Sequence, residues 1–404
     1  MTLTSLSALI SNGTLAVRVR LPTQEPAQRP PCDDAIHLAF LLDTSGSMNG
    51  EPLSRVKRTL HAARPLLQLG DRVTLITFST AATVVVDNLL MDADGDTVLF
   101  TAIDQLVANG STNMAAAFDA LGTLHLRLDA IVLLTDGMVN IGIKSTEGLR
   151  ALASGLGTMP FYTLGYGADH NRPLLQQLAT NSRGSYTYIR DEMTLPEIMG
   201  DIISGLRFQV YSRASLRVPG GLCKELGFSG ERYMIGSVIP GRDYWAVFDL
   251  AGDGDEYGER TVGLYNDTDL LVDSIATFVD NGNLEVEEQI LRCKVAVVLE
   301  AATAALEAGQ ERPSSLAELC AAIDAMPPAL KERPLVSSMR AQLEDIRTLP
   351  TTLELLARMS SDTAYLSTQR GVSSGYTTFS SPAQRNASDT TQILYSSQRT
   401  EDPE

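Results

Sequence analysis

The chain has 404 residues, of which 44% are hydrophobic and 20% are charged, as is typical of a soluble globular protein. This length predicts two or three domains, because single hydrophobic cores stop growing well before it. The formal net charge of -17 disfavours nucleic acids and anionic membranes, whose phosphates the chain would repel. No apolar run approaches membrane-spanning length. We therefore expect neither a nucleic-acid nor a membrane partner.

The cysteines and the first residues bear on the cellular compartment. The four cysteines lie far apart and form no C-x-x-C pair, so reduced thiols are preferred over a disulfide framework or a zinc site. Residues 1–13 carry no basic residue before their short apolar patch, unlike a secretory signal. We expect a cytoplasmic protein with free thiols at Cys32, Cys223, Cys293 and Cys320.

Residues 35–204 alternate short apolar segments with amphipathic helical stretches. The pattern predicts helices that begin at Pro52 and Asn113, and Pro65 is expected to kink or end the first of them. Further helices are predicted over 173–180 and 195–204. Strands are predicted over 35–42, 73–78, 83–90 (at a sheet edge), 130–135, 159–165 and 186–189. This alternation predicts an α/β fold with a doubly wound, mostly parallel sheet, in which ligands bind beyond the carboxyl ends of the strands.

After residue 205, apolar and polar residues alternate between glycine-rich turns, which predicts a small antiparallel β-sandwich. Its strands are expected over 208–218, 232–239 and 243–250, and 15–21 alternates in the same way. Helices are predicted from 284, then over 314–326 and 335–359, before an end rich in Ser, Thr and Gln that is expected to be flexible. The predicted domains are an α/β domain (35–205), a sandwich (13–34 plus 206–280), a helical region (281–366) and a flexible tail (367–404).

Oxygen-bearing side chains follow two of the predicted strands and precede one helix. Asp43-x-Ser45-x-Ser47 ends the first strand, Thr112 stands before the helix that Asn113 opens, and Asp136 ends the strand over 130–135. Carboxylate and hydroxyl oxygens without thiolate or imidazole suit Mg²⁺, Mn²⁺ or Ca²⁺. We predict that these five residues bind a divalent cation, with Mg²⁺ favoured.

The number of these ligands has a consequence for function. Five side chains do not easily complete an octahedron if some act through water, so one coordination position stays open or water-filled. A carboxylate from another molecule is its natural occupant, because hard cations prefer anionic oxygen. We therefore expect a scaffold that binds an Asp or Glu residue of a partner protein through the ion, and no enzymatic activity.

In their order and strand context, the five residues resemble the metal-ion-dependent adhesion site of von Willebrand factor A domains. The flanking sequences Asp71-Arg72-Val73, Thr77-Phe78-Ser79 and Leu133-Leu134-Thr135-Asp136-Gly137 are similar too. The resemblance covers about 35–204 and implies a Rossmann-like fold. It also implies that Ser45, Ser47 and Thr112 bind the ion directly, while Asp43 and Asp136 act mainly through water.

A second resemblance concerns the rest of the chain. Met48-x-Gly50-x-Pro52-Leu53 looks like the intracellular members of the family, which carry a sandwich beside the A domain and of which some adjoin RING or U-box modules of ubiquitin ligases. The C-terminal helices and the segment from Gln369 to Thr378 are similar to intein-linked relatives. The chain contains no RING pattern of cysteines and histidines, so ligase activity is not implied.

Two other functions compete with the scaffold. One is an adaptor in ubiquitin-ligase or other complex assembly, in which the metal merely stabilises the sheet. The other is a metal-dependent hydrolase, which is disfavoured because no obvious general base accompanies the site. A haloacid-dehalogenase phosphatase needs a second aspartate where Ser45 stands.

Overall fold

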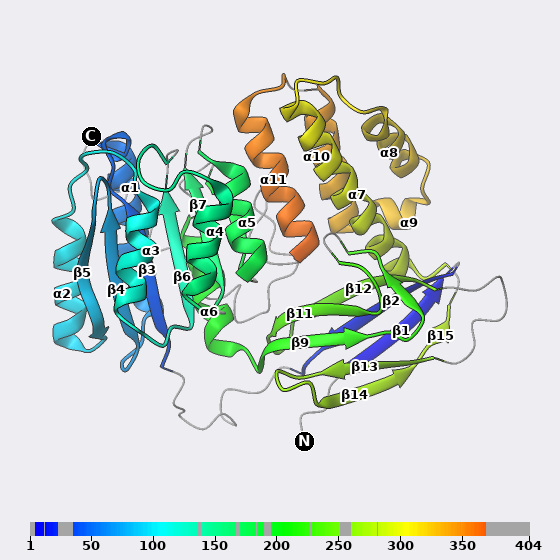
Figure 1. Ribbon diagram of the computed structural model, residues 1–404. Helices are drawn as coiled ribbons and strands as arrows, with labels where there is room; N and C mark the ends of the chain where they lie inside the picture. The colour runs from blue at the N-terminus through cyan, green and yellow to red at the C-terminus, as the bar shows by residue number, and fades with distance from the viewer. Residues whose placement is uncertain are drawn as a thin grey trace. The chain divides into compact units, whose positions relative to one another are not determined.

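The computed structural model describes residues 5–368 except 12, 23–34, 136–138, 158, 167–169, 183, 190–194, 226–227, 251–259, 281 and 349. The described residues form two compact units (Figure 1). The α/β unit lies within Arg29–Arg207. The second unit contains a β-sandwich followed by α-helices, and it is called the β-helical unit below. It combines residues of Met1–Gln28 with those of Phe208–Arg370.

A six-stranded sheet with the order β5-β4-β3-β6-β7-β8 forms the centre of the α/β unit. All neighbouring strands are parallel except β5, which pairs antiparallel with β4 at the edge of the sheet, and this confirms the predicted mostly parallel sheet. β3, β6 and β7 are buried along their whole length, because helices cover both faces. The strands are β3 (His37–Asp43), β4 (Arg72–Phe78), β5 (Ala82–Leu90), β6 (Ala130–Thr135), β7 (Phe161–Tyr166) and β8 (Tyr186–Ile189).

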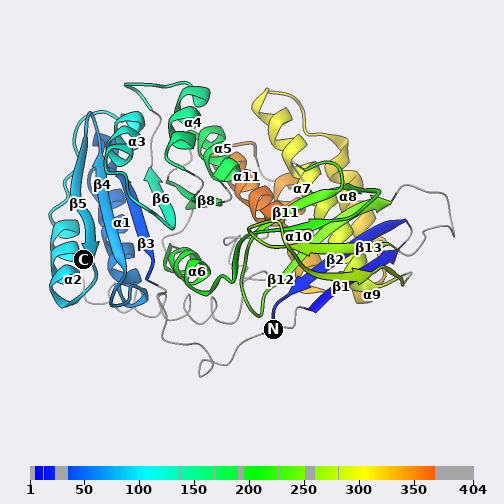
Figure 2. The same ribbon diagram turned by 60° about the horizontal axis from the view of Figure 1, so that its bottom comes forward.

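The two faces of this sheet carry separate helix layers, which Figure 2 shows on opposite sides of the strands. Even-numbered residues of β3 such as Phe40 face one hydrophobic core, and odd-numbered residues such as Leu41 face the other, as the two-residue period of a strand requires. The first core contains α1 (Glu51–Ala63), α2 (Ala93–Asp104) and α6 (Leu195–Phe208), and the second contains α3 (Met114–Thr123), α4 (Thr146–Gly155) and α5 (Arg172–Ser182).

Local sequence signals set the ends of these helices. α1 ends at Ala63 and a 3-10 turn over Arg64–Leu66 follows, so the predicted effect of Pro65 is confirmed. The Asn113 side chain caps α3 by accepting a hydrogen bond from the backbone N–H of Ala116 at 3.3 Å. α4 was not predicted, because only Leu149 and Ala153 mark its buried face.

Two sheets form the sandwich of the β-helical unit, with the orders β10-β12-β2-β1-β15 and β11-β9-β13-β14. β2 pairs antiparallel with β12, which confirms that residues 15–21 join this sandwich. Val17, Leu216 and Phe248 lie in one hydrophobic core that both sheets share. The strands are β1 (Ser5–Ser11), β2 (Thr14–Arg20), β9 (Tyr211–Arg217), β10 (Gly221–Cys223), β11 (Arg232–Val238), β12 (Asp243–Leu250), β13 (Thr261–Tyr265), β14 (Leu271–Ala276) and β15 (Phe278–Val279).

Two of the predicted elements differ from the structure. The strand predicted over 208–218 begins only at Tyr211, because α6 continues through Phe208. The single helix predicted over 335–359 was wrong: α10 ends at Thr348 and α11 begins at Leu353. Pro350 lies between them, and a proline has no N–H and disfavours helical geometry in the residue before it.

The remaining helices follow the sandwich in sequence. α11 extends two residues into the predicted tail, and the rest of that prediction, from 369 onward, lies outside the described residues. None of the helices in the described part of the chain is long and apolar enough to cross a bilayer. The helices are α7 (Leu284–Glu307), α8 (Ser314–Asp324), α9 (Pro328–Lys331), α10 (Pro334–Thr348) and α11 (Leu353–Thr368).

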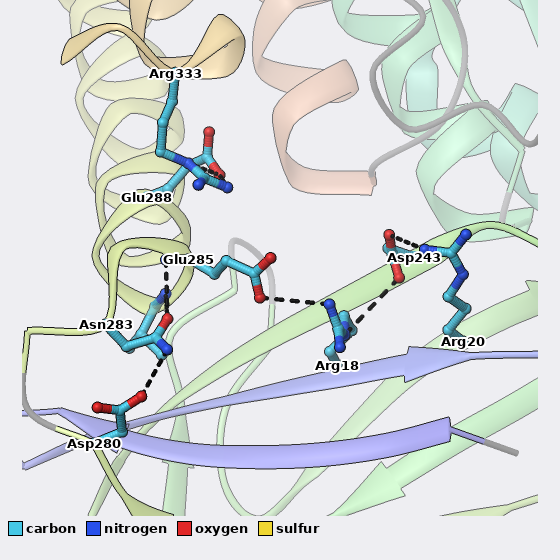
Figure 3. A network of polar contacts seen from close by, with 9 residues as sticks. Arg18, Arg20, Asp243, Asp280, Asn283, Glu285, Glu288 and Arg333 are labelled. Carbon is cyan, nitrogen blue, oxygen red and sulfur yellow. Dashed lines mark hydrogen bonds and ion pairs between the residues drawn. The ribbon is translucent and has the colours of Figure 1, made fainter. Parts of the chain in front are cut away.

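α7 packs against the outer face of the sheet that contains β2 and β12. Its first turn is capped by Asn283, and Glu285 accepts a hydrogen bond from Arg18 Nη1 at 3.4 Å (Figure 3). The Arg18 guanidinium lies 5.5 Å from the centre of the Trp245 ring, which packs with Val286 below the helix. A polar and an apolar contact therefore both anchor the start of α7 to the sandwich.

Candidate metal centre

Asp43 ends β3 and is buried, with 1% of its surface exposed. Its Oδ2 accepts a hydrogen bond of 2.6 Å from the Thr135 hydroxyl, and its Oδ1 accepts one of 2.9 Å from the backbone N–H of Ser45. Thr135 ends β6, the parallel neighbour of β3. The two side chains meet because parallel strands bring their carboxyl ends to one edge of the sheet.

Burial raises the pKa of the Asp43 carboxyl, and the hydrogen bonds from Thr135 and Ser45 act in the opposite direction. No lysine or arginine of the described residues contributes to this shift. The carboxylate is thus desolvated and has hydroxyl and amide donors in place of a cationic side chain. A bound divalent cation would offset the cost of this desolvation, so the site fits a metal ion.

Ser45 and Ser47 lie in the tight turn that follows β3, and Met48, which is fully buried, anchors this turn in the core. The two hydroxyl oxygens are 3.1 Å apart. Adjacent ligands of an octahedral Mg²⁺, each roughly 2.0–2.1 Å from the ion, lie about 3 Å apart. Ser45 is buried and Ser47 is exposed, so this pair of oxygens suits an ion that solvent or a partner can reach.

Backbone hydrogen bonds join this turn to the loop before α3. Gly46 N–H donates to the carbonyl of Gly110 at 3.0 Å, and Asn109 N–H donates to the carbonyl of Thr44 at 2.8 Å. Gly110 has φ +73°, and a Cβ at this position would lie 2.6 Å from Thr80 Oγ1. Glycine is therefore required at position 110, where the loop before α3 approaches the turn between β4 and β5.

Thr112 belongs to the loop before α3 and is buried, with 2% of its surface exposed. Its N–H donates to the Oδ1 of Asn140 at 2.9 Å, and its carbonyl accepts from the N–H groups of Asn140 and Ile141 at 3.1 and 3.3 Å. Asn140 was not among the predicted site residues. No local sequence signal identifies it, because its partner is 28 positions away in the chain.

The structure thus brings four of the five predicted residues to one edge of the sheet, namely Asp43, Ser45, Ser47 and Thr112. Asp136 follows Thr135 directly but lies outside the described residues. Within the described ranges, no group of three or more His, Cys, Asp and Glu residues could hold a metal. The predicted set differs from such groups, because three of its five side chains are hydroxyls.

Comparison with known proteins identifies the α/β unit. Residues 36–188 match the family model of the von Willebrand factor type A domain. This part of the chain is a von Willebrand factor A domain. Von Willebrand factor A domains typically mediate protein–protein interactions, and some contain a metal-ion-dependent adhesion site.

Curated relatives match about two fifths of the chain. An uncharacterised protein of Synechocystis is 29% identical over 167 residues, and the bovine inter-alpha-trypsin inhibitor heavy chain H1 is 24% identical over 170 residues. Each match covers 39% of this chain. The chain spans 38% of the length of the Synechocystis protein and 19% of the bovine one, so each similarity concerns only a part of both proteins.

Two solved structures match most of the chain. A von Willebrand factor type A protein from Catenulispora acidiphila has a TM-score of 0.64 at 16% identity, over 92% of this chain and 96% of that one. The ArnB paralog VWA2 from Sulfolobus acidocaldarius has a TM-score of 0.51 at 15% identity, over 90% of this chain and 98% of that one. At these identities the likeness is one of fold.

Proposed function

We propose that this protein is a metal-dependent scaffold that binds an acidic residue of a partner protein through a divalent cation. The observation that carries the proposal is the buried carboxylate of Asp43 beside the hydroxyl pair of Ser45 and Ser47, whose oxygens are 3.1 Å apart. Backbone hydrogen bonds tie this turn to the loop that contains Thr112. The role that von Willebrand factor A domains typically have in protein–protein interactions supports this reading.

In this proposal, Ser45, Ser47 and Thr112 bind the ion directly, while Asp43 and Asp136 act mainly through water. The ion, Mg²⁺ before Mn²⁺ or Ca²⁺, supplies a Lewis-acidic position for a carboxylate from outside. Neutral hydroxyl ligands leave more positive charge on the ion than carboxylate ligands would. An Asp or Glu side chain of the partner is therefore the favoured occupant.

The geometry of Asp43 favours binding over hydrolysis. Both of its oxygens already accept hydrogen bonds, one from the Thr135 hydroxyl and one from the Ser45 amide. A general base must lie within hydrogen-bond reach of the proton that it removes from the substrate. Only 1% of the surface of Asp43 is exposed, so a substrate reaches this carboxylate poorly, which supports a protein without enzymatic activity.

We also propose the cytoplasm as its location. We propose the predicted domain division as well (a sandwich over 13–34 plus 206–280, a helical region over 281–366 and the domain over 35–205), with β1 (Ser5–Ser11) added to the sandwich. Three of the four cysteines lie in the described part of the chain, and each is a buried free thiol. Free thiols support a reducing compartment. The intracellular type of von Willebrand factor A protein, with an accessory sandwich and helices, agrees with this location.

Metal-dependent capture tests the function. The protein is immobilised and incubated with native lysate in Mg²⁺, and again in EDTA. We expect to find partners that the protein retains in Mg²⁺ and releases in EDTA. The Asp43→Ala variant should fail to retain these partners. Asp87→Ala is the matched control, because it removes an exposed carboxylate from β5 of the same domain. Partners that still bind Asp43→Ala or that resist EDTA would contradict the proposal.

A further inference from the structure

We infer that Asn140 is a positioning residue of the metal centre, which holds Thr112 in place for the ion. This inference rests on the proposed function and adds to it a residue outside the predicted set of five. The loop that follows Asp136 would thereby control a ligand in another loop. Its basis is the set of hydrogen bonds between Asn140, Ile141 and the backbone of Thr112.

The contacts satisfy both backbone groups of Thr112. Its N–H donates to the carboxamide Oδ1 of Asn140 at 2.9 Å, and its carbonyl accepts from the N–H groups of Asn140 and Ile141. A backbone that is held at both its donor and its acceptor has little freedom to rotate. Because the Thr112 side chain projects from this backbone, the position of its hydroxyl depends on Asn140.

Gly142 brings the same loop against the next residue of the ligand loop. It has φ +73°, and a Cβ at this position would lie 2.3 Å from Asn113 Oδ1. That oxygen also caps α3 by accepting from Ala116 N–H. A side chain at position 142 would therefore push the loop away from the start of α3, and the contacts of Asn140 with Thr112 would lengthen.

The position of Asn140 in the chain gives these contacts a functional meaning. It follows the predicted ligand Asp136 by four residues, whereas Thr112 belongs to the loop before α3. The hydrogen bonds thus couple two parts of the metal centre that come from different loops. Groups that orient metal ligands from outside the coordination sphere change metal affinity by about 10–100-fold when they are removed.

The test compares Asn140→Ala with Asn140→Asp. Alanine removes the acceptor for Thr112 N–H, whereas aspartate keeps an oxygen at this position. We expect Mn²⁺ binding, measured by titration calorimetry, to weaken about 10–100-fold in Asn140→Ala and to be at least as tight as in the unmodified protein in Asn140→Asp. Gly142→Ala is expected to weaken binding like Asn140→Ala, and Ile143→Ala, an exposed residue of the same loop, is the matched control.

Hydrogen exchange of the metal-free protein supplies a second measurement. We expect the Thr112 amide to exchange slowly in the unmodified protein and in Asn140→Asp, and faster in Asn140→Ala. Equal Mn²⁺ affinity and equal Thr112 exchange in Asn140→Ala would overturn the inference and leave the proposed function standing. If the unmodified protein binds no Mn²⁺, the proposed function and the role of Asn140 in it both fail, whatever the exchange rates show.

Discussion

Arg292 and Glu225 form an ion pair in which both side chains are buried, with distances of 2.9 Å between Nη1 and Oε2 and 2.5 Å between Nη2 and Oε1. Arg292 Nη1 also donates to the carbonyl of Leu366 in α11 at 2.7 Å. Glu225 Oε1 accepts from the N–H of Val247 in β12. A single guanidinium thus joins α7, α11 and the sandwich within the β-helical unit.

Replacing Arg292 with Met should destabilise the β-helical unit by about 3–5 kcal/mol, because it leaves the Glu225 carboxylate buried without its cation. Methionine keeps much of the apolar volume of the arginine. Trp245 is the sole tryptophan of the chain and lies in β12, so its fluorescence reports on this unit. Urea denaturation followed by that fluorescence measures the loss.

The double variant Glu225→Met/Arg292→Met is the control for this prediction. Removing both charges removes the desolvation cost as well, so the double variant should recover most of the lost stability. An unchanged urea midpoint in Arg292→Met alone would show that the pair contributes nothing to the unit.

Arg207→Met should destabilise the α/β unit in the same way. Arg207, in the last turn of α6, donates to both carboxylate oxygens of Asp71 at 2.7 and 3.3 Å. Asp71 also accepts from the backbone N–H of Ile36 and that of Gln68, so this pair holds the segments that enter β3 and β4. We expect faster hydrogen exchange in β4 and α6. Exchange as slow as in the unmodified protein would refute this role of the pair.

His37 should make the α/β unit less stable as the pH falls. Burial lowers the pKa of this imidazole, whose Nε2 lies 3.0 Å from the Thr74 hydroxyl. The folded state therefore binds a proton less readily than the unfolded state, in which the pKa is about 6.5. The contribution of neutral His37 is complete above that value and decreases as the pH falls from about 6.5 toward the lowered pKa.

His37→Gln tests this pH dependence, because glutamine keeps a polar group near Thr74 but does not titrate. Thermal unfolding is followed by calorimetry between pH 8 and pH 5.5. We expect the unmodified protein to lose stability more steeply than His37→Gln below pH 6.5. Parallel curves for the two proteins would exclude His37 as the source of the slope.

Divalent cations should stabilise the α/β unit and leave Thr112→Val unaffected. A ligand that binds only the folded state at 100 times its Kd adds about 2.7 kcal/mol to the free energy of unfolding. Valine keeps the shape of Thr112 but removes its hydroxyl. Thermal unfolding with and without Mg²⁺ measures the effect, and Ser111→Ala is the control in the same loop. A Tm increase in Thr112→Val as large as in the unmodified protein would argue against ligation by Thr112.

Local sequence patterns were sufficient for the elements that position the site. Continuous apolar residues marked β3 and β6, and a capping residue marked the start of α3. The short β13, β14 and β15 were missed because their residues are few or largely exposed. The prediction of one helix over 335–359 did not take Pro350 into account, and the structure has α10 before this residue and α11 after it.

The five candidate ligands Asp43, Ser45, Ser47, Thr112 and Asp136 could be named from residue types, strand ends and family resemblance. Tertiary structure alone decided that Asn140 contacts Thr112 and that Arg292 is buried against Glu225, partners 28 and 67 positions apart. Hydrophobic periodicity and caps are local and can be read along the chain. Contacts between distant loops leave no such local trace, because they form only when the packed strands and helices bring those loops together.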